Sequence, residues 1–245
     1  MRPFFSAFDF IRVINLPGRV DRRRQMLAEL QRVGLGDDGR VAFVEAIKSD
    51  TAAPWRLNGE RGVFLSHLKV LREAAAKNAS VLILEDDADF TGAAPATEIE
   101  DDVAIFYGGY QASDPADLHS SDIIGAHCMG FSAETVRALV PYLEALFDHP
   151  SPPPIDGAYV WFRRANPEMK TQFAEPAVAV QRSSRSDIAH LRFFDRWDGM
   201  RQLAALARRG LRAARRGEIT FGLREAIVLA IIGVAVAIAA AVRNG

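Results

Sequence analysis

Residues 81–89 read Val-Leu-Ile-Leu-Glu-Asp-Asp-Ala-Asp, so a run of four apolar side chains is followed by four carboxylates in five positions. A short apolar run of this kind is typical of a buried strand. In an open α/β sheet, ligands bind at the carboxyl ends of the strands. The segment therefore predicts a buried strand with a functional site at its end.

Carboxylates this close repel one another, and the repulsion raises one or more of their pKa values unless a cation neutralises them. Mg²⁺ and Mn²⁺ suit carboxylate ligands. Because side chains alternate along an extended chain, we expect Glu85, Asp87 and Asp89 to share one side of it. The pattern favours a metal ion that bridges to a diphosphate. The alternative is an acidic, solvated turn that ends the strand.

The composition fits one sizeable core with an appendage, because 49% of the 245 residues are hydrophobic. The single cysteine, Cys128, excludes an internal disulfide and fits a reducing compartment. Residues 201–245 carry eight arginines and two glutamates, a net charge of +6, which leaves −7 for the first 200 residues. An acidic body with a basic tail does not fit a domain that grips nucleic acid.

Hydrophobic periodicity predicts strands that alternate with helices. The expected strands are residues 11–16, 41–44, 81–84, 103–107 and 123–131, and the expected helices are 21–33, about 65–78 and 133 to about 147. We expect Ser132 to cap the last helix, Gly59–Gly62 to form a loop, and Gly108-Gly109 to end a strand. The alternation predicts an α/β domain with a largely parallel sheet over residues 1–195.

The tail has two parts. In residues 196–218 the arginines gather on one side of a helical wheel, which suits an anionic membrane surface; the alternative is a helix packed on its own domain. Residues 219–245 include seventeen uncharged residues, 226–242, where a bilayer span needs about 17–25. The arginines before this segment predict a membrane anchor with the main domain on the cytoplasmic side. The alternatives are a buried helix or an oligomer contact.

Five motifs occur in order between residues 11 and 188. They are Val13-Ile14-Asn15-Leu16 with Arg19, Asp21, Arg22 and Arg23; Gly59-Glu60-Arg61-Gly62 with Ser66-His67; Leu84-Glu85-Asp86-Asp87; Pro154-Ile155-Asp156; and Gln181 with Ser186-Asp187-Ile188. Together they resemble glycosyltransferase family 25, which includes bacterial lipopolysaccharide galactosyltransferases and collagen galactosyltransferases. Cys128 and Met129 depart from the aromatic residues that the family often shows there.

The resemblance implies a GT-A type, Rossmann-like fold and an inverting transfer of a sugar, usually galactose, from a UDP-sugar with Mn²⁺ or Mg²⁺. Asp87 and Glu85 would contact the metal, and Asp156 would act as the base, although a helix cap is an equal reading of Asp156. Asp187 is the alternative base or a second metal contact. The implied donor-binding residues are Asn15, Arg22, Ser66, His67, Glu85 and Asp86.

The implied acceptor is a hydroxyl of an envelope glycan or glycolipid, such as lipopolysaccharide core or a lipid-linked oligosaccharide, at the cytoplasmic face of a bacterial inner membrane. One alternative is another nucleotide-using α/β transferase, such as a nucleotidyltransferase, but the chain has neither common glycine-rich phosphate-binding signature. The other is a glycosyltransferase-like domain that has lost turnover and serves as a membrane-bound assembly partner. The intact Glu85-Asp86-Asp87 counts against that reading.

Overall fold

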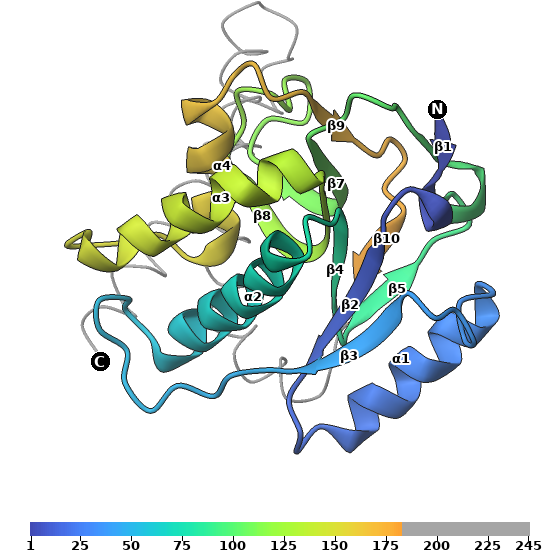
Figure 1. Ribbon diagram of the computed structural model, residues 1–245, viewed down its shortest axis with the longest axis horizontal. Coiled ribbons are helices and arrows are strands. Elements are labelled where there is room, and N and C mark those ends of the chain that lie inside the picture. Colours follow the sequence, from blue (N-terminus) through green and yellow to red (C-terminus); the bar gives the residue numbers. More distant parts are fainter. Residues whose placement is uncertain (183–245) are drawn as a thin grey trace, which may run out of the picture. The chain divides into compact units, whose positions relative to one another are not determined.

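A six-stranded mixed sheet forms the centre of residues 1–182, the part of the chain that the computed structural model describes (Figure 1). The strand order is β3-β2-β4-β8-β7-β9. These strands are β2 (Phe10–Asn15), β3 (Val41–Glu45), β4 (Val81–Glu85), β7 (Ile105–Ala112), β8 (Ile123–Phe131) and β9 (Thr171–Phe173). Two short antiparallel pairs accompany the sheet: β1 (Arg2–Pro3) with β6 (Glu98–Ile99), and β5 (Ala88–Phe90) with β10 (Ala179–Gln181).

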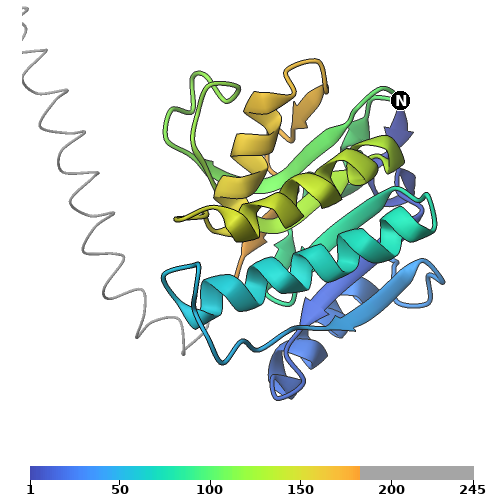
Figure 2. The ribbon, with the colours of Figure 1, turned by 60° about the vertical axis from the view of Figure 1, so that its left-hand side comes forward.

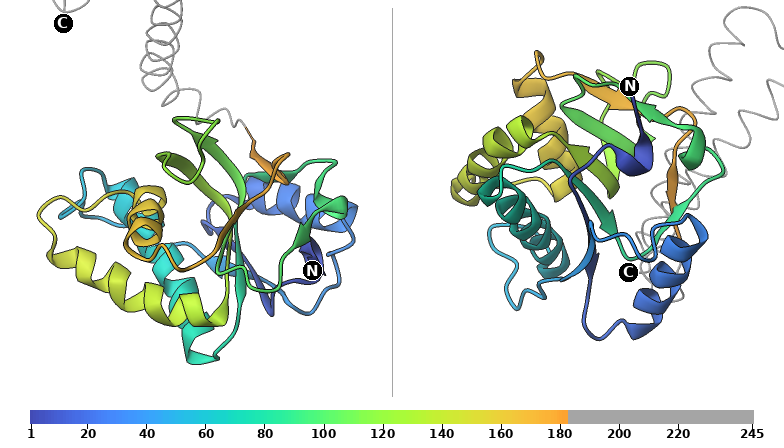
Figure 3. Two further views of the ribbon diagram at one scale, coloured as in Figure 1. Left: turned by 90° about the horizontal axis from the view of Figure 1, so that it is seen from above. Right: turned by 45° about the vertical axis from the view of Figure 1, so that its right-hand side comes forward.

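Helices cover both faces of the sheet, with α2, α3 and α4 on one face and α1 on the other (Figures 2 and 3). Within residues 1–182 the helices are α1 (Val20–Arg32), α2 (Asn58–Ala76), α3 (Ala133–Ala145) and α4 (Ile155–Ala165). Three short 3₁₀ turns are η1 (Phe4–Ser6), η2 (Ala94–Ala96) and η3 (Leu146–Asp148). Ser132 caps α3 as predicted, because its hydroxyl accepts a hydrogen bond from the backbone N–H of Thr135.

Strand β4 is buried on both faces, as its unbroken apolar run predicts. Val81 and Ile83 pack into the core beneath α2, α3 and α4, whereas Leu82 and Leu84 pack into the core beneath α1. All four side chains are fully buried. Since burying one such side chain contributes about 1.5–3 kcal/mol, this strand fixes the carboxylates that follow it in a defined place.

The chain reverses its winding direction at β2. From β2 it passes through α1 to β3 on one side, and then through α2 to β4 on the other side. Both neighbours are parallel to β2, so the carboxyl ends of these three strands meet at one edge. A crevice outside the carboxyl ends, at such a reversal, is the usual ligand site of open α/β sheets.

The prediction of a largely parallel sheet is confirmed for β2, β3, β4, β7 and β9, since β2 is parallel to β3 and β4, and β7 is parallel to β9. It is wrong for β8, which runs antiparallel to both β4 and β7. A parallel connection needs a crossover of a dozen or more residues, and residues 113–122 between β7 and β8 are too few. The predicted strand end at Gly108-Gly109 is also wrong, because β7 continues to Ala112. A Cβ on Gly109 would lie 2.2 Å from the His127 ring, so these glycines permit close packing within the strand.

The predicted loop at Gly59–Gly62 is instead the first turn of α2, which begins at Asn58. Glycine weakens a helix by about 1 kcal/mol, yet tertiary contact decides the outcome here. A Cβ on Gly62 would lie 2.6 Å from the backbone oxygen of Ile47, so only glycine lets the helix approach the segment after β3.

No helix within residues 1–182 is both long and apolar enough to cross a bilayer. The predicted amphipathic helix at 196–218, the predicted anchor at 219–245, the predicted domain boundary at 195 and Asp187 all lie outside the described residues.

Replacing Gly62 by alanine should destabilise the protein, because the new Cβ would clash with the backbone oxygen of Ile47, which cannot rotate away as a side chain could. We expect a loss of about 1–3 kcal/mol in the free energy of unfolding, measured by urea denaturation. Gly59→Ala is the matched control in the same helical turn, since a Cβ there meets nothing within 4 Å. Equal effects of the two substitutions would contradict the close approach of α2 to Ile47.

Candidate functional site

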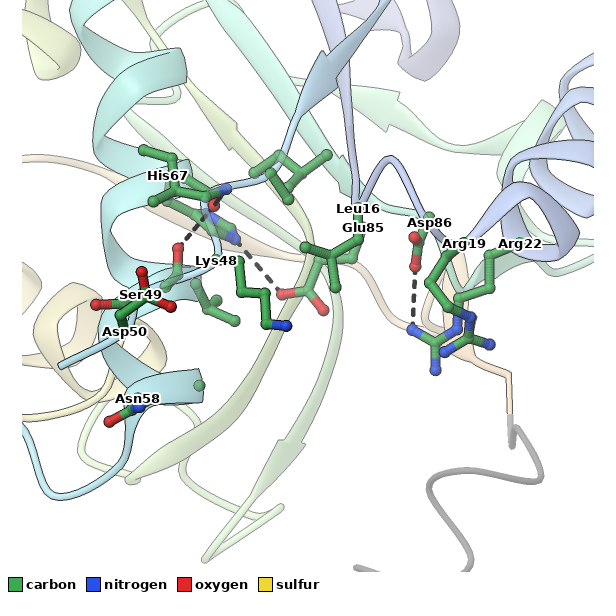
Figure 4. Close-up of a pocket in the computed structure, with 17 residues that line it drawn as sticks. Leu16, Arg19, Arg22, Lys48, Ser49, Asp50, Asn58, His67, Glu85 and Asp86 are labelled. Carbon is green, nitrogen blue, oxygen red and sulfur yellow. Dashed lines mark hydrogen bonds and ion pairs between the residues drawn. The ribbon is translucent and has the colours of Figure 1, made fainter. Parts of the chain in front are cut away.

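A pocket of about 440 Å³ lies at the carboxyl ends of β2, β3 and β4, beside the first turn of α2 (Figure 4). Its size is within the usual range for small-molecule sites. Five of the predicted site residues line it: Arg22, Ser66, His67, Glu85 and Asp86. Asn15, Asp87 and Asp156 are not among its lining residues.

The pocket brings cations and carboxylates together. Arg19, Arg22 and Lys48 supply positive charge, and Asn58 and Gly59 place the positive end of the α2 dipole at the same wall. Figure 4 shows Glu85 between Lys48 and His67 on one side and the Asp86–arginine group on the other. Such an arrangement suits an anionic ligand, particularly a phosphate or diphosphate.

Arg22 pairs with two of the clustered carboxylates and offsets part of their charge. Its Nη1 lies 3.0 Å from Asp86 Oδ1 and 3.0 Å from Asp87 Oδ2. Asn15, at the end of β2, donates from Nδ2 to Asp86 Oδ2 at 2.7 Å. Asn15 and Arg22 therefore contact the carboxylates that follow β4 directly. Asn15 does so from the end of β2, the strand that pairs with β4.

Asp87 is the most perturbed of these acids. It is only 4% exposed, and its Oδ1 has no hydrogen-bond partner among the described residues. Burial, followed by the negative charge of Glu85, raises the pKa of Asp87 to about 7, and Arg22 offsets part of this effect. Strand β10 holds the neighbouring backbone, because the N–H of Arg182 donates to the Asp87 carbonyl oxygen at 2.7 Å.

The predicted row of Glu85, Asp87 and Asp89 along one side of an extended chain is wrong. Strand β4 ends at Glu85, and a turn at Asp86 and Asp87 precedes β5. Glu85 lines the pocket, whereas Asp89 pairs with Arg182. The turn breaks the alternation because β5 has to fold back against β10.

No group of three or more histidine, cysteine, aspartate or glutamate side chains within residues 1–182 is arranged to hold a metal ion by itself. The donor set nevertheless fits a hard cation, because Asp87 presents a buried, unpartnered carboxylate oxygen next to Asp86 and Glu85. Mg²⁺ in particular is commonly bound by one or two carboxylates together with substrate phosphates and water. The residues present fit a metal that arrives with a phosphorylated ligand.

Glu85 is held by a buried histidine. His67, in the middle of α2, is 0% exposed, and its Nε2 lies 3.4 Å from Glu85 Oε1. Its Nδ1 lies 2.9 Å from the hydroxyl of Tyr159 in α4. Burial alone would raise the pKa of Glu85, but the His67 contact lowers it below the usual value, with help from His127 and Arg22.

Two predicted site residues already have local structural roles. The Ser66 hydroxyl accepts a hydrogen bond from the N–H of Ile47 and donates to the Gly62 oxygen, so it ties α2 to the pocket wall. Asp156 lies in the first turn of α4, and its carboxylate accepts hydrogen bonds from the N–H groups of Gly125 and Gly157. The Asp156 contact with Gly125 joins α4 to β8.

Sequence reasoning missed Lys48, Ser49 and Asp50, which follow β3 and line the pocket. The signal was available, since a strand was predicted at 41–44 and its carboxyl end belongs to the same edge as that of residues 81–84. It missed Asn58 because it predicts a loop at Gly59–Gly62, where α2 in fact begins at Asn58.

The sequence matches no protein-family profile and no curated protein. Among solved structures, the fold is similar to a glycosyltransferase involved in glycosylation of the major capsid of PBCV-1, with a TM-score of 0.48 and 11% identity over 73% of this chain and 96% of that one. It is also similar to the CTP:phosphocholine cytidylyltransferase of Streptococcus pneumoniae, with a TM-score of 0.37 and 14% identity over 76% and 78%. Function must therefore be argued from the residues of the pocket.

The raised pKa of Asp87 predicts a stability that depends on pH in the metal-free protein. Its folded-state value of about 7 lies above the ordinary 3.8, so ionisation of Asp87 opposes folding. This cost is absent below the ordinary value and complete above about pH 7. Asp87→Asn should therefore gain stability relative to wild type, by an amount that grows to a few kcal/mol between about pH 5 and pH 8.

Chemical denaturation in EDTA at both pH values would measure this difference. A difference between Asp87→Asn and wild type that stays constant across the range would contradict the placement of Asp87 as a buried carboxylate next to Glu85.

Proposed function

We propose that this protein is an inverting, metal-dependent glycosyltransferase that moves a sugar from a UDP-sugar to a hydroxyl of an envelope glycan or glycolipid. The observation that carries the proposal is the pocket at the winding reversal, where Arg19, Lys48 and the start of α2 face Glu85 and Asp86. A nucleoside diphosphate needs positive charge for its phosphates, and a departing diphosphate needs its developing charge neutralised.

The donor fits the pocket in two parts. The diphosphate would lie among Arg19, Lys48 and the N-terminal turn of α2. The apolar walls formed by Ile14, Ile47 and Val63 suit the face of a nucleobase. The motif resemblance to glycosyltransferase family 25 supports UDP-galactose as the donor.

Asp87, with Glu85 and Asp86, would hold Mn²⁺ or Mg²⁺, and the ion would act as a Lewis acid toward the diphosphate oxygens. Arg22 pairs with both Asp86 and Asp87, so it holds the two carboxylates of the acidic turn close together. His67 and Asn15 hold Glu85 and Asp86 from two other elements.

An inverting transfer needs a base that accepts the proton of the acceptor hydroxyl. Asp156 stays our first proposal for this role because of its motif, and it has an ordered carboxylate between α4 and β8. Asp187 is the alternative.

The basic segment 196–218 and the apolar segment 219–245 would bind an anionic membrane and place the pocket at the cytoplasmic face of a bacterial inner membrane. Removal of residues 196–245 should release the protein from the membrane fraction to the soluble fraction on cell fractionation. An unchanged distribution would contradict the anchor.

Calorimetric titration tests the donor site. UDP and UDP-galactose should bind the wild-type protein with Mn²⁺, and binding should weaken at least tenfold in EDTA or in Asp87→Ala, because the diphosphate then faces uncompensated carboxylates. Asp89→Ala is the matched control, two positions along the chain, because Asp89 pairs with Arg182 outside the pocket.

The cationic wall is tested in the same titrations. Lys48→Ala should weaken UDP more than uridine, whereas Lys77→Ala, at the far end of α2, should weaken neither. Tighter binding of CTP or another nucleoside triphosphate would favour a nucleotidyltransferase. UDP-galactose binding without turnover on any acceptor glycan would favour a non-catalytic partner. No nucleotide binding by the folded protein would reject the glycosyltransferase mechanism.

A further inference from the structure

A chain of three side chains in contact runs from the helical layer to the pocket. It joins Tyr159 on α4, His67 on α2 and Glu85 at the end of β4. Tyr159 and His67 are buried at 1% and 0% exposure, whereas 25% of the Glu85 side chain is exposed. Glu85 and His67 both line the pocket, so the chain links the hydrophobic core to the ligand site (Figure 4).

The chemistry of the two ends decides which ring nitrogen of His67 carries the proton. Burial raises the pKa of Tyr159 well above its ordinary value, so its phenol keeps its proton and can donate it in a hydrogen bond to Nδ1. An ionised Glu85 can only accept hydrogen bonds. Nε2 makes no hydrogen bond within residues 1–182, but it lies 3.4 Å from Glu85 Oε1, so the electrostatically favoured place for the ring proton is Nε2, where it faces the carboxylate.

The opposite tautomer is disfavoured by simple electrostatics. With the proton on Nδ1, the lone pair of Nε2 would face a carboxylate oxygen at 3.4 Å, and two acceptors would be buried against each other. A histidine tautomer fixed by a second hydrogen bond is a common way of orienting a functional group.

We propose that Tyr159 and His67 are positioning residues, which hold Glu85 toward the donor pocket through the hydrogen bond from Tyr159 O–H to Nδ1 and the electrostatic contact of Nε2–H with Glu85 Oε1. The contact takes one carboxylate oxygen of Glu85 and leaves Oε2 outside it. This role rests on the proposed donor site.

Tyr159→Phe is the decisive variant, because it removes only the hydroxyl and keeps the ring that packs on Phe131 with centroids 5.0 Å apart. Tyr142→Phe is the matched control on α3, where the ring packs on Phe162. Thermal unfolding would establish that both variants fold. Two readouts follow: the His67 tautomer, from long-range ¹H–¹⁵N spectra of histidine-labelled protein, and UDP affinity with Mn²⁺, from calorimetry.

The wild-type protein and Tyr142→Phe should show His67 protonated at Nε2 alone. Tyr159→Phe should shift the Nδ1 resonance and lose this single tautomer, and its UDP affinity should fall about tenfold. A wild-type His67 protonated at Nδ1, or a Tyr159→Phe protein with unchanged tautomer and UDP affinity, would overturn the proposal that Tyr159 and His67 position Glu85. Absence of UDP binding by the wild-type protein would instead overturn the donor site, while the spectra would still decide the tautomer.

Discussion

Mutual repulsion among Glu85, Asp86 and Asp87 is the constraint on which the rest of this structure depends. They follow a strand that is buried on both faces, so all three carboxylates are held close together at one edge of the sheet. Burial and the neighbouring charge of Glu85 raise the pKa of Asp87 to about 7, because its ionised carboxylate has little contact with water. The surrounding elements are therefore arranged to supply positive charge and hydrogen-bond donors.

Each compensating group comes from a different part of the chain. Arg22 extends from α1 to two of the carboxylates, and Asn15 donates from the end of β2. His67 contacts Glu85 from α2, and the N–H of Arg182, directly after β10, donates to the backbone oxygen of Asp87. Because these contacts span the winding reversal, the acidic turn is stabilised by elements that lie far apart in the chain. The compensation leaves one carboxylate oxygen of Asp87 without a hydrogen-bond partner among residues 1–182.

The helical layer has two roles in this arrangement. Its apolar side covers the hydrophobic core. Its other role is to position the pocket wall: Gly62 lets α2 approach Ile47, and the Ser66 hydroxyl then holds the helix there by two hydrogen bonds. The same helix presents its N-terminus to the pocket and carries His67 in its interior. One element therefore provides both the attraction for an anion and the orientation of Glu85.

The sequence by itself determined the buried strand predicted at 81–84, the strand at 123–131 and the Ser132 cap, because each depends on local periodicity or a local hydrogen bond. Only the tertiary structure decided that β8 is antiparallel, that Gly59–Gly62 is helical, and that Lys48 lines the pocket while Asp156 does not. These outcomes depend on contacts between residues far apart in the chain, where one close approach outweighs a local preference of about 1 kcal/mol.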